Sequence, residues 1–253
     1  MSRMRNIKGA KATISHFIYR RKREMAGTAM HLAIADRVAV LFGKENIKNL
    51  PYFFSGSIAP DAIHARANYE RSMKKHTHLT EGISNSDFIY PDKLAIFRER
   101  LDRYIKTYYH REDDDAELYL GWIVHLITDE LFNIHIYSDG GFASRLKQDG
   151  VNPNEMEFFH RFMYDMNLMD ELVMKNYAFV HDVERELSAA WGLGVKDMIL
   201  PEESDASKNW VISKLFHSNF SDLAPVYYSK EEAYDFILKS SDEIVNRIMC
   251  LLK

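Results

Sequence analysis

The most restrictive feature of this 253-residue sequence is the stretch from Leu118 to Tyr137, which reads LYLGWIVHLITDELFNIHIY. It is apolar enough to form a central buried helix, yet it contains His125, Asp129, Glu130 and His135. A buried charge is costly unless it is paired or bound to a metal ion. A charged residue at the centre of a membrane span costs about 2.5–3.5 kcal/mol, so the carboxylates argue against a transmembrane helix. The stretch therefore predicts a buried helix in a soluble protein, with ionisable groups that need partners.

Composition favours a mainly helical protein. Hydrophobic residues make up 46% of the chain and aromatic residues 13%, which is enough for a large core, while prolines (6) and glycines (11) are few. The length fits one large domain, and the sequence contains no internal repeat or low-complexity tract. We therefore predict an all-α fold, with a single multi-helix domain over residues 25–253 and a metal cleft between buried helices.

Charge is distributed unevenly along the chain. The first 23 residues contain eight basic residues and no acidic one, although the formal net charge of the whole chain is −4. The acidic remainder gives no strong signal for nucleic-acid binding. Residues 1–24 are predicted to be either a disordered extension or a basic amphipathic segment that contacts an anionic membrane surface.

The single cysteine, Cys250, excludes an intrachain disulfide and fits a reducing compartment. The N-terminus lacks the apolar core of about 7–15 residues that a secretory signal contains. We therefore expect a cytoplasmic protein, with peripheral membrane contact through residues 1–24 as the alternative. The sequence gives no indication of the oligomeric state.

Helical periodicity and capping residues predict the other elements. A first helix would have Thr28 as its N-cap and would end near Gly43. Residues 51–61 (PYFFSGSIAPD) and 200–208 contain prolines and are predicted to be loops. The remaining predicted helices are Leu94–Tyr108, a helix from the Asn152–Glu155 cap to about Tyr177, Val180–Ala190, and a terminal helix opened by Ser229. In the second of these we expect Met156, Phe159, Met163, Met166 and Met169 to face inward.

The spacing of the ionisable residues in the central stretch indicates more than one metal ion. His125 and Asp129 are four residues apart, so on a helix both project from one face and can bind one ion. His135 lies about 120° from Asp129 around the axis and about 9 Å further along it, so it would serve a neighbouring ion. Glu130 points about 100° away from Asp129, and we expect it to support the site or to form an ion pair in the core.

Three further motifs precede this stretch. They are MHLAIAD with His31, GSIAPD with Asp61, and KKHTHL with His76 and His78. The central stretch then contributes a fourth motif, HLITDELFNIH, which has the pattern HxxxDxxxxxH. In this order the motifs resemble the zinc-dependent phospholipase C superfamily, which also contains single-strand nucleases. The resemblance extends over about residues 25 to 137.

This resemblance implies an all-α fold that binds one to three zinc ions, with other divalent metals as alternatives. The ligands of a first zinc would be Asp61, His78, His125 and Asp129. Asp129 would also reach a second zinc shared with His31, and His135 would belong to a remaining ion. Asp61 and Asp129 are the candidate catalytic residues, because Asp61 could also orient or deprotonate the attacking water.

The sequence departs from the family pattern in two places. The secreted phospholipases place an N-terminal tryptophan on the ion shared with His31, and no tryptophan precedes His31 here. They complete the His135 ion through a downstream HxxxE motif, whereas here His160 is followed by Tyr164 at i+4 and Asp165 at i+5. His160 and Asp165 are therefore candidate late ligands.

Two other histidine positions stay open at this stage. His76 and His78 are two residues apart and point to opposite sides, so we expect only one of them to face the site, and His76 could replace His78. His64 follows Asp61 by three residues and is a candidate to support the ligands.

The chemistry of these residues suits the hydrolysis of phosphoric esters. Histidine and carboxylate ligands suit zinc, and clustered divalent ions bind phosphate and lower the pKa of bound water towards 7. We predict a phospholipase C-like phosphodiester hydrolase that uses metal-activated water on a small phosphoester or a phospholipid headgroup. The alternatives are a catalytically degenerate metal-binding protein of the same fold and, from the doublet His181 and Asp182, an HD-type phosphohydrolase.

Overall fold

The computed structural model describes residues 27–176, 180–217 and 223–251, so the predicted basic extension of residues 1–24 lies outside the described residues. Within these ranges the chain is helical and contains no β-strand, which confirms the all-α prediction. The elements are α2 (Thr28–Phe42), η1 (Lys44–Asn46), α3 (Leu50–Gly56), η2 (Ala59–Ala65), α4 (Arg71–Thr77), η3 (Asn85–Ile89), α5 (Pro91–Tyr108), α6 (Ala116–Tyr137), α7 (Phe142–Gln148), α8 (Met156–Asn176), α9 (Val180–Ala189), α10 (Pro201–Val211), η4 (Ile212–Phe216) and α11 (Lys230–Leu251).

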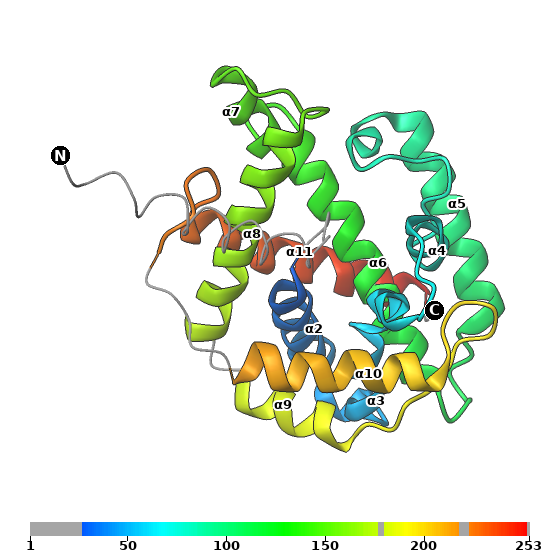
Figure 1. Ribbon diagram of the computed structural model, residues 1–253. Helices are drawn as coiled ribbons and strands as arrows, with labels where there is room; N and C mark the ends of the chain where they lie inside the picture. Colours follow the sequence, from blue (N-terminus) through cyan, green and yellow to red (C-terminus); the bar gives the residue numbers. More distant parts are fainter. Residues whose placement is uncertain (1–26, 177–179, 218–222, 252–253) are drawn as a thin grey trace.

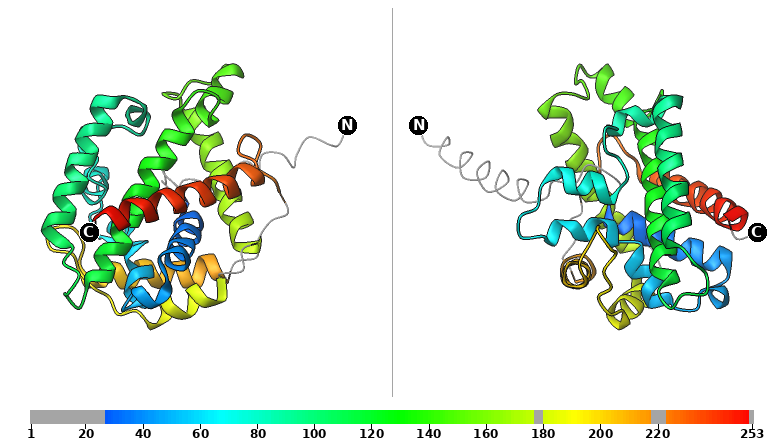
Figure 2. Two further views of the ribbon diagram at one scale, coloured as in Figure 1. Left: turned by 180° about the vertical axis from the view of Figure 1, so that it is seen from behind. Right: turned by 90° about the vertical axis from the view of Figure 1, so that its right-hand side faces the viewer.

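The predicted central helix is α6, and it begins at Ala116, two residues earlier than expected. It crosses the middle of the molecule, with α8 and α5 on opposite sides, and α11 crosses it in the view from behind (Figures 1 and 2). Helices α2, α3, α5, α7 and α11 all contact it. Its apolar side chains, among them the fully buried Trp122, belong to one hydrophobic core that extends through the surrounding helices. No helix among the described residues has the length and apolarity needed to cross a membrane.

Two glycines let α3 approach α6 backbone to backbone. A Cβ atom at Gly56 would lie 2.1 Å from the carbonyl oxygen of Leu118, and one at Gly121 would lie 2.1 Å from that of Phe53. Real Cβ atoms do not approach other atoms so closely, so both positions require glycine. This contact places the backbone at the end of α3 directly against the part of α6 that carries His125.

The first helix is capped differently from the prediction. Thr28 is the first residue of α2, and the N-cap is Gly27, which offers no side chain to the helix end. Instead, Asp170 of α8 accepts a hydrogen bond of 3.1 Å from the backbone N–H of Ala29. A carboxylate from another helix thus stabilises the first turn of α2, the turn that contains His31.

Both segments predicted as loops because of their prolines are helical, so these predictions were wrong. Pro51, Pro60 and Pro201 lie in the first turns of α3, η2 and α10, where a backbone N–H has no helical partner to lose. Glu203 completes the start of α10 by accepting the N–H of Leu200 at 2.8 Å.

The later helices follow the prediction more closely. Ser229 Oγ accepts the N–H of Glu232 at 3.1 Å and so caps α11, as predicted. In α8, Met163, Met166 and Met169 are buried, but Met156, the first residue of the helix, is 69% exposed. The inward orientation predicted for Met156 was therefore wrong.

Candidate metal centre

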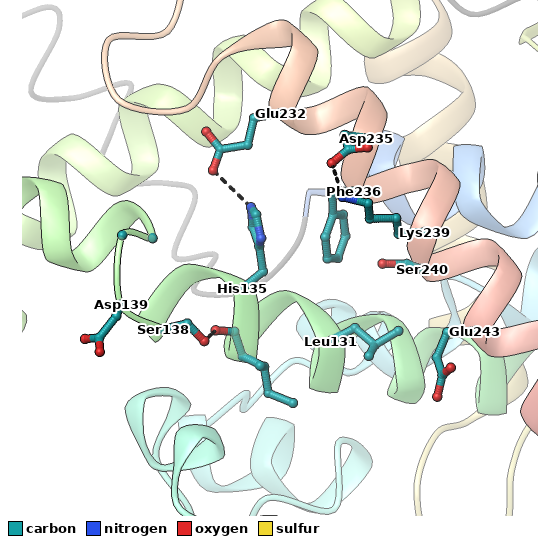
Figure 3. A pocket seen from close by; sticks show the side chains of 13 residues that line it. Leu131, His135, Ser138, Asp139, Glu232, Asp235, Phe236, Lys239, Ser240 and Glu243 are labelled. Carbon is teal, nitrogen blue, oxygen red and sulfur yellow. Dashed lines mark hydrogen bonds and ion pairs between the residues drawn. The ribbon is translucent and has the colours of Figure 1, made fainter.

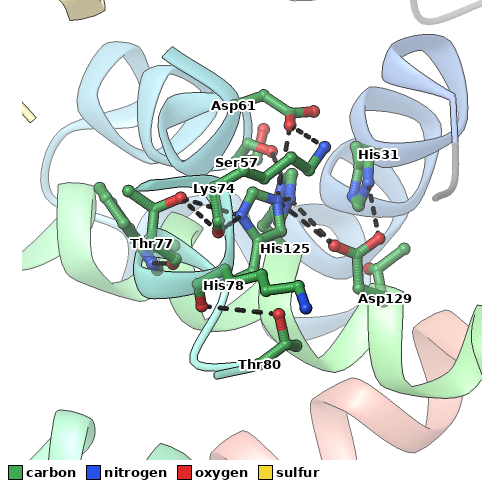
Figure 4. Close-up of polar contacts among 12 residues, drawn as sticks. His31, Ser57, Asp61, Lys74, Thr77, His78, Thr80, His125 and Asp129 are labelled. Atoms are coloured by element: carbon green, nitrogen blue, oxygen red, sulfur yellow. Dashed lines mark hydrogen bonds and ion pairs between the residues drawn. The ribbon is translucent and has the colours of Figure 1, made fainter. Parts of the chain in front are cut away.

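Four separate elements bring five of the predicted ligands together (Figure 4). The members of this donor group are His31 in the first turn of α2, Asp61 in η2, His78 directly after α4, and His125 and Asp129 on α6. Two overlapping sets within the donor group have ligand atoms that all lie within 4.8 Å of one another: His31, His125 and Asp129, and Asp61, His78 and His125. Residues from before, within and after the segment 51–61 thus converge on α6.

Backbone carbonyl groups fix the tautomers of two imidazoles. The Nδ1–H of His125 donates to the carbonyl of Ser57 at 2.8 Å, and the Nδ1–H of His78 donates to the carbonyl of Lys74 at 2.9 Å. Both rings therefore direct Nε2 into the centre, and the two Nε2 atoms lie 3.3 Å apart. Two nitrogen lone pairs at this distance repel each other unless a cation, either a proton or a metal ion, lies between them.

Asp129 is a buried carboxylate that lacks hydrogen-bond donors. Its Oδ1 lies 3.3 Å from Nε2 of His31, and its Oδ2 lies 3.3 Å from Nε2 of His125, but neither oxygen accepts a hydrogen bond. His31 likewise makes no side-chain hydrogen bond and is held by stacking on His125, with ring centroids 3.8 Å apart. Buried polar groups without partners are rare in native proteins, and here they face one another.

The separations fit the edges of a metal coordination shell. Ligand distances of about 2.0–2.2 Å in a tetrahedral zinc site imply separations of about 3.3–3.6 Å between ligand atoms. His78 Nε2 lies 3.3 Å from Nε2 of His125, 3.5 Å from Oδ1 of Asp61 and 3.7 Å from Oδ2 of Asp129. The residues present therefore suit zinc in both type and spacing, and the hydrogen bonds at Nδ1 are those that metal-binding histidines make.

The electrostatics of the donor group favour an ionised Asp129 and neutral His31 and His78, and they favour a proton on His125. Burial opposes ionisation of Asp129, but His125 and His31 outweigh it and hold the pKa of this carboxyl below its ordinary value. Burial and the neighbouring Lys74 ammonium lower the pKa of His78 to about 4, and burial and His125 lower the pKa of His31. Burial also disfavours charge on His125, but Asp129 outweighs it and raises the pKa of His125. A proton on His125 can thus occupy the place of a cation when no metal is bound.

The donor group opens to solvent on the side of Asp61. The side chain of Asp61 is 20% exposed and that of His64 is 30% exposed, whereas the imidazole of His78 is 1% exposed. His64 Nε2 lies 3.6 Å from Asp61 Oδ1, as expected for a residue that supports this ligand. Burial raises the pKa of Asp61, but Lys74, His64 and His78 outweigh it and hold the pKa well below the ordinary value.

His135, the sixth predicted ligand, lies apart from the donor group. Its Nε2 is 3.0 Å from Glu232 of α11, and the same carboxylate accepts two hydrogen bonds from Arg145, of 2.9 and 3.1 Å. The ion pair borders an open pocket of about 560 Å³ between α6 and α11 (Figure 3). The assignment of His135 to a further ion stays a prediction, and Glu232 is the carboxylate that the structure places beside it.

The other candidate residues have partners elsewhere. His76 is exposed and pairs with Glu81 at 2.7 Å, so it is His78 that faces the donor group. His160 is exposed on α8, and the buried Asp165 accepts the backbone N–H groups of Val226, Tyr227 and Tyr228. These contacts fix the segment before α11 and leave both late-ligand candidates outside the donor group.

The HD doublet does not form part of a metal group in the described residues. Asp182 is exposed on α9 and lies 3.1 Å from Arg185, one turn later on the same helix. The side chain of His181 lies outside the described residues. The arrangement gives no support to an HD-type site.

Glu130 has the second of the two roles expected for it, that of a core ion-pair partner. Its side chain is 0% exposed and accepts hydrogen bonds from Arg98 of α5 at 2.9 and 2.6 Å and from Arg247 of α11 at 2.9 Å. The carboxylate thus ties three helices together, and it points about 100° away from Asp129 around the axis of α6.

Sequence reasoning missed two groups that shape the donor group, the Ser57 carbonyl and Lys74. A backbone carbonyl carries no sequence signal, so Ser57 could not be found without the fold. Lys74 had a weak signal, because it precedes His78 by four residues and would share its side of a helix.

Comparison with known proteins agrees with this geometry. No curated protein and no solved structure matches the sequence significantly. Residues 30–178, more than half of the chain, match the family model described as zinc dependent phospholipase C, and this segment contains every member of the donor group. The chain therefore belongs to the zinc-dependent phospholipase C family.

Proposed function

We propose that this protein is a zinc-dependent hydrolase of phosphoric esters that cleaves phosphodiesters. The observation that carries the proposal is the pair of imidazole Nε2 atoms that face each other at 3.3 Å, beside the carboxylate of Asp129, which accepts no hydrogen bond. A divalent cation resolves both the repulsion of the nitrogens and the burial of the carboxylate. Membership of the zinc-dependent phospholipase C family supports the same chemistry.

Each member of the donor group has a role in this proposal. Asp61, His78, His125 and Asp129 would hold one zinc ion, and His31 with Asp129 would hold a second. Zinc, when bound, supplies a Lewis acid that lowers the pKa of water towards 7 and stabilises charge on phosphate oxygens. Asp61 lies at the exposed edge and is ionised, so its free oxygen would orient the attacking water by accepting a hydrogen bond from it.

The substrate class follows from the chemistry rather than from a shaped pocket. A small phosphoester or a phospholipid headgroup would fit a site whose exposed edge is formed by Asp61 and His64. We also propose a cytoplasmic location, based on the single cysteine. The basic residues of 1–24 would allow the protein to contact an anionic membrane surface from there.

Elemental analysis and a hydrolysis assay test the proposed function together. Protein purified without added metal should contain at least one equivalent of zinc, and it should cleave a chromogenic diester such as bis(4-nitrophenyl) phosphate. A chelator should abolish turnover, and zinc should restore it.

Two other outcomes have different meanings. Bound zinc without hydrolysis of any ester in a broad panel would favour the degenerate metal-binding protein, an alternative also allowed by the pairing of His135 with Glu232. A metal-free protein whose thermal stability does not change with chelator or zinc would contradict both.

A further inference from the structure

Lys74 brings a positive charge into the donor group. It lies on α4, its side chain is 12% exposed, and its Nζ is 2.6 Å from Oδ1 of Asp61 (Figure 4). The backbone carbonyl of the same residue accepts the hydrogen bond from Nδ1 of His78. Lys74 therefore contacts two predicted ligands, one through its backbone and one through its side chain.

The ammonium group and a metal ion would use the same oxygen. Oδ1 of Asp61 is the atom in contact with Lys74, and it is also the atom 3.5 Å from Nε2 of His78. An ion held by Asp61 and His78 would lie only a few ångströms from the Lys74 ammonium and would repel it, since both are cations in a largely buried site. The flexible stem of lysine allows the ammonium to leave Asp61 while the backbone hydrogen bond to His78 stays in place.

The position of Lys74 determines where its ammonium can go. The imidazoles of His78 and His125 are both 1% exposed, so the buried side of the donor group is closed to a substrate. Lys74, Asp61 and His64 form the edge that is partly exposed. A phosphate group that reaches the ions must therefore pass this edge, and an ammonium group is a strong point-charge partner for a phosphate oxygen.

We propose that Lys74 is a substrate-binding residue: its ammonium occupies the place of a cation on Asp61 in the metal-free protein and binds the phosphate of the ester once Asp61 binds zinc. This inference rests on the proposed function and adds the residue that recognises the anionic group. It also makes the binding of zinc at Asp61 and the binding of phosphate mutually favourable. Phosphate draws the Lys74 ammonium away from Asp61 and so frees Asp61 for zinc, and zinc at Asp61 frees the ammonium for phosphate.

Calorimetric titrations test the inference without turnover, with zinc alone and inorganic phosphate as probes. In the full chain, Lys74→Met should bind zinc at the Asp61 site at least tenfold more tightly than the wild type, because the competing charge is gone. The zinc-loaded Lys74→Met variant should bind inorganic phosphate at least tenfold more weakly. Lys74→Arg, which keeps the charge, should bind phosphate within about threefold of the wild type.

Lys75→Met is the matched control, since Lys75 is the next residue of the same helix and should change neither affinity by more than about twofold. Lys74→Gln repeats the test with a polar side chain if the methionine variant does not fold. Phosphate affinity of zinc-loaded Lys74→Met equal to that of the wild type would overturn the inference and leave Lys74 with the sole role of neutralising Asp61. Zinc affinity that is unchanged or lower in Lys74→Met would overturn it as well.

The failure of this inference differs from the failure of the proposed function. Wild-type protein that hydrolyses a diester while Lys74→Met binds phosphate normally contradicts only the role of Lys74. Wild-type protein that binds zinc and phosphate but cleaves no ester contradicts only the hydrolase activity.

Discussion

Asp129 and Glu130 are adjacent on α6, and both are buried, yet their surroundings are opposite. Glu130 accepts hydrogen bonds from Arg98 and Arg247, so the fold itself compensates its charge. Asp129 is flanked by imidazoles and accepts no hydrogen bond. Burying an ionised carboxylate is unfavourable in both cases. The difference indicates that Glu130 stabilises the fold, whereas Asp129 could bind a metal ion, as the proposed function requires.

His135 belongs with Glu130 in this comparison. It also lies on α6, and its partner Glu232 is held by Arg145. Glu130 and His135, two ionisable residues of α6 that pair with side chains of other helices, therefore contrast with the donor group on the same helix.

The largest expected effect comes from Asp129→Asn. Since Asp129 would bridge both ions, we expect zinc affinity and diester turnover to fall more than about 100-fold, beyond the 10–100-fold that loss of a residue supporting a ligand costs. The metal-free variant should keep its free energy of unfolding to within about 1 kcal/mol, because the cost of burying the carboxylate and its attraction to a protonated His125 are removed together. Calorimetry with zinc and chemical denaturation after chelation measure the two quantities. Loss of stability without loss of zinc binding would contradict the assignment of Asp129 to a metal.

Glu130→Gln should have the reverse pattern. Breaking a buried ion pair costs about 3–5 kcal/mol, and partial exposure of Arg98 and Arg247 places the expected loss near the lower end, about 3 kcal/mol of unfolding free energy. Zinc affinity of the folded variant should stay within about threefold of the wild type. Denaturation of the metal-free protein and a zinc titration below the unfolding transition provide the test. A 100-fold loss of zinc affinity with normal stability would erase the distinction between the two carboxylates.

The smallest expected effect is that of His135→Gln. The ion pair with Glu232 is partly exposed, at 32% and 21% for the two side chains, so its loss should cost at most about 1 kcal/mol. The number of zinc ions bound by the donor group should not change. Elemental analysis of the variant beside the wild type is decisive. A loss of one equivalent would show that His135 binds a further ion and belongs with the metal ligands, not with Glu130.

Much of the donor group could be predicted from the sequence because its signals are local. The spacing of His125 and Asp129 on one helix, and the histidine and aspartate motifs before them, are visible in the printed letters. The distribution of apolar residues predicted most of the helices for the same reason. Prolines misled the prediction at 51–61 and 200–208, because a proline in the first turn of a helix and a proline in a loop look alike without the neighbouring caps.

The sequence by itself determined which residue types are available and that α6 must be buried with ionisable groups on it. Only the tertiary structure decided which of these groups receive partners. The close contact of Gly56 and Gly121 brings the Ser57 carbonyl to His125, α4 places Lys74 on Asp61, and α5 and α11 bring arginines to Glu130 but not to Asp129. The physical reason is that charge compensation acts over a few ångströms between segments far apart in the chain, whereas sequence patterns report only neighbours along it.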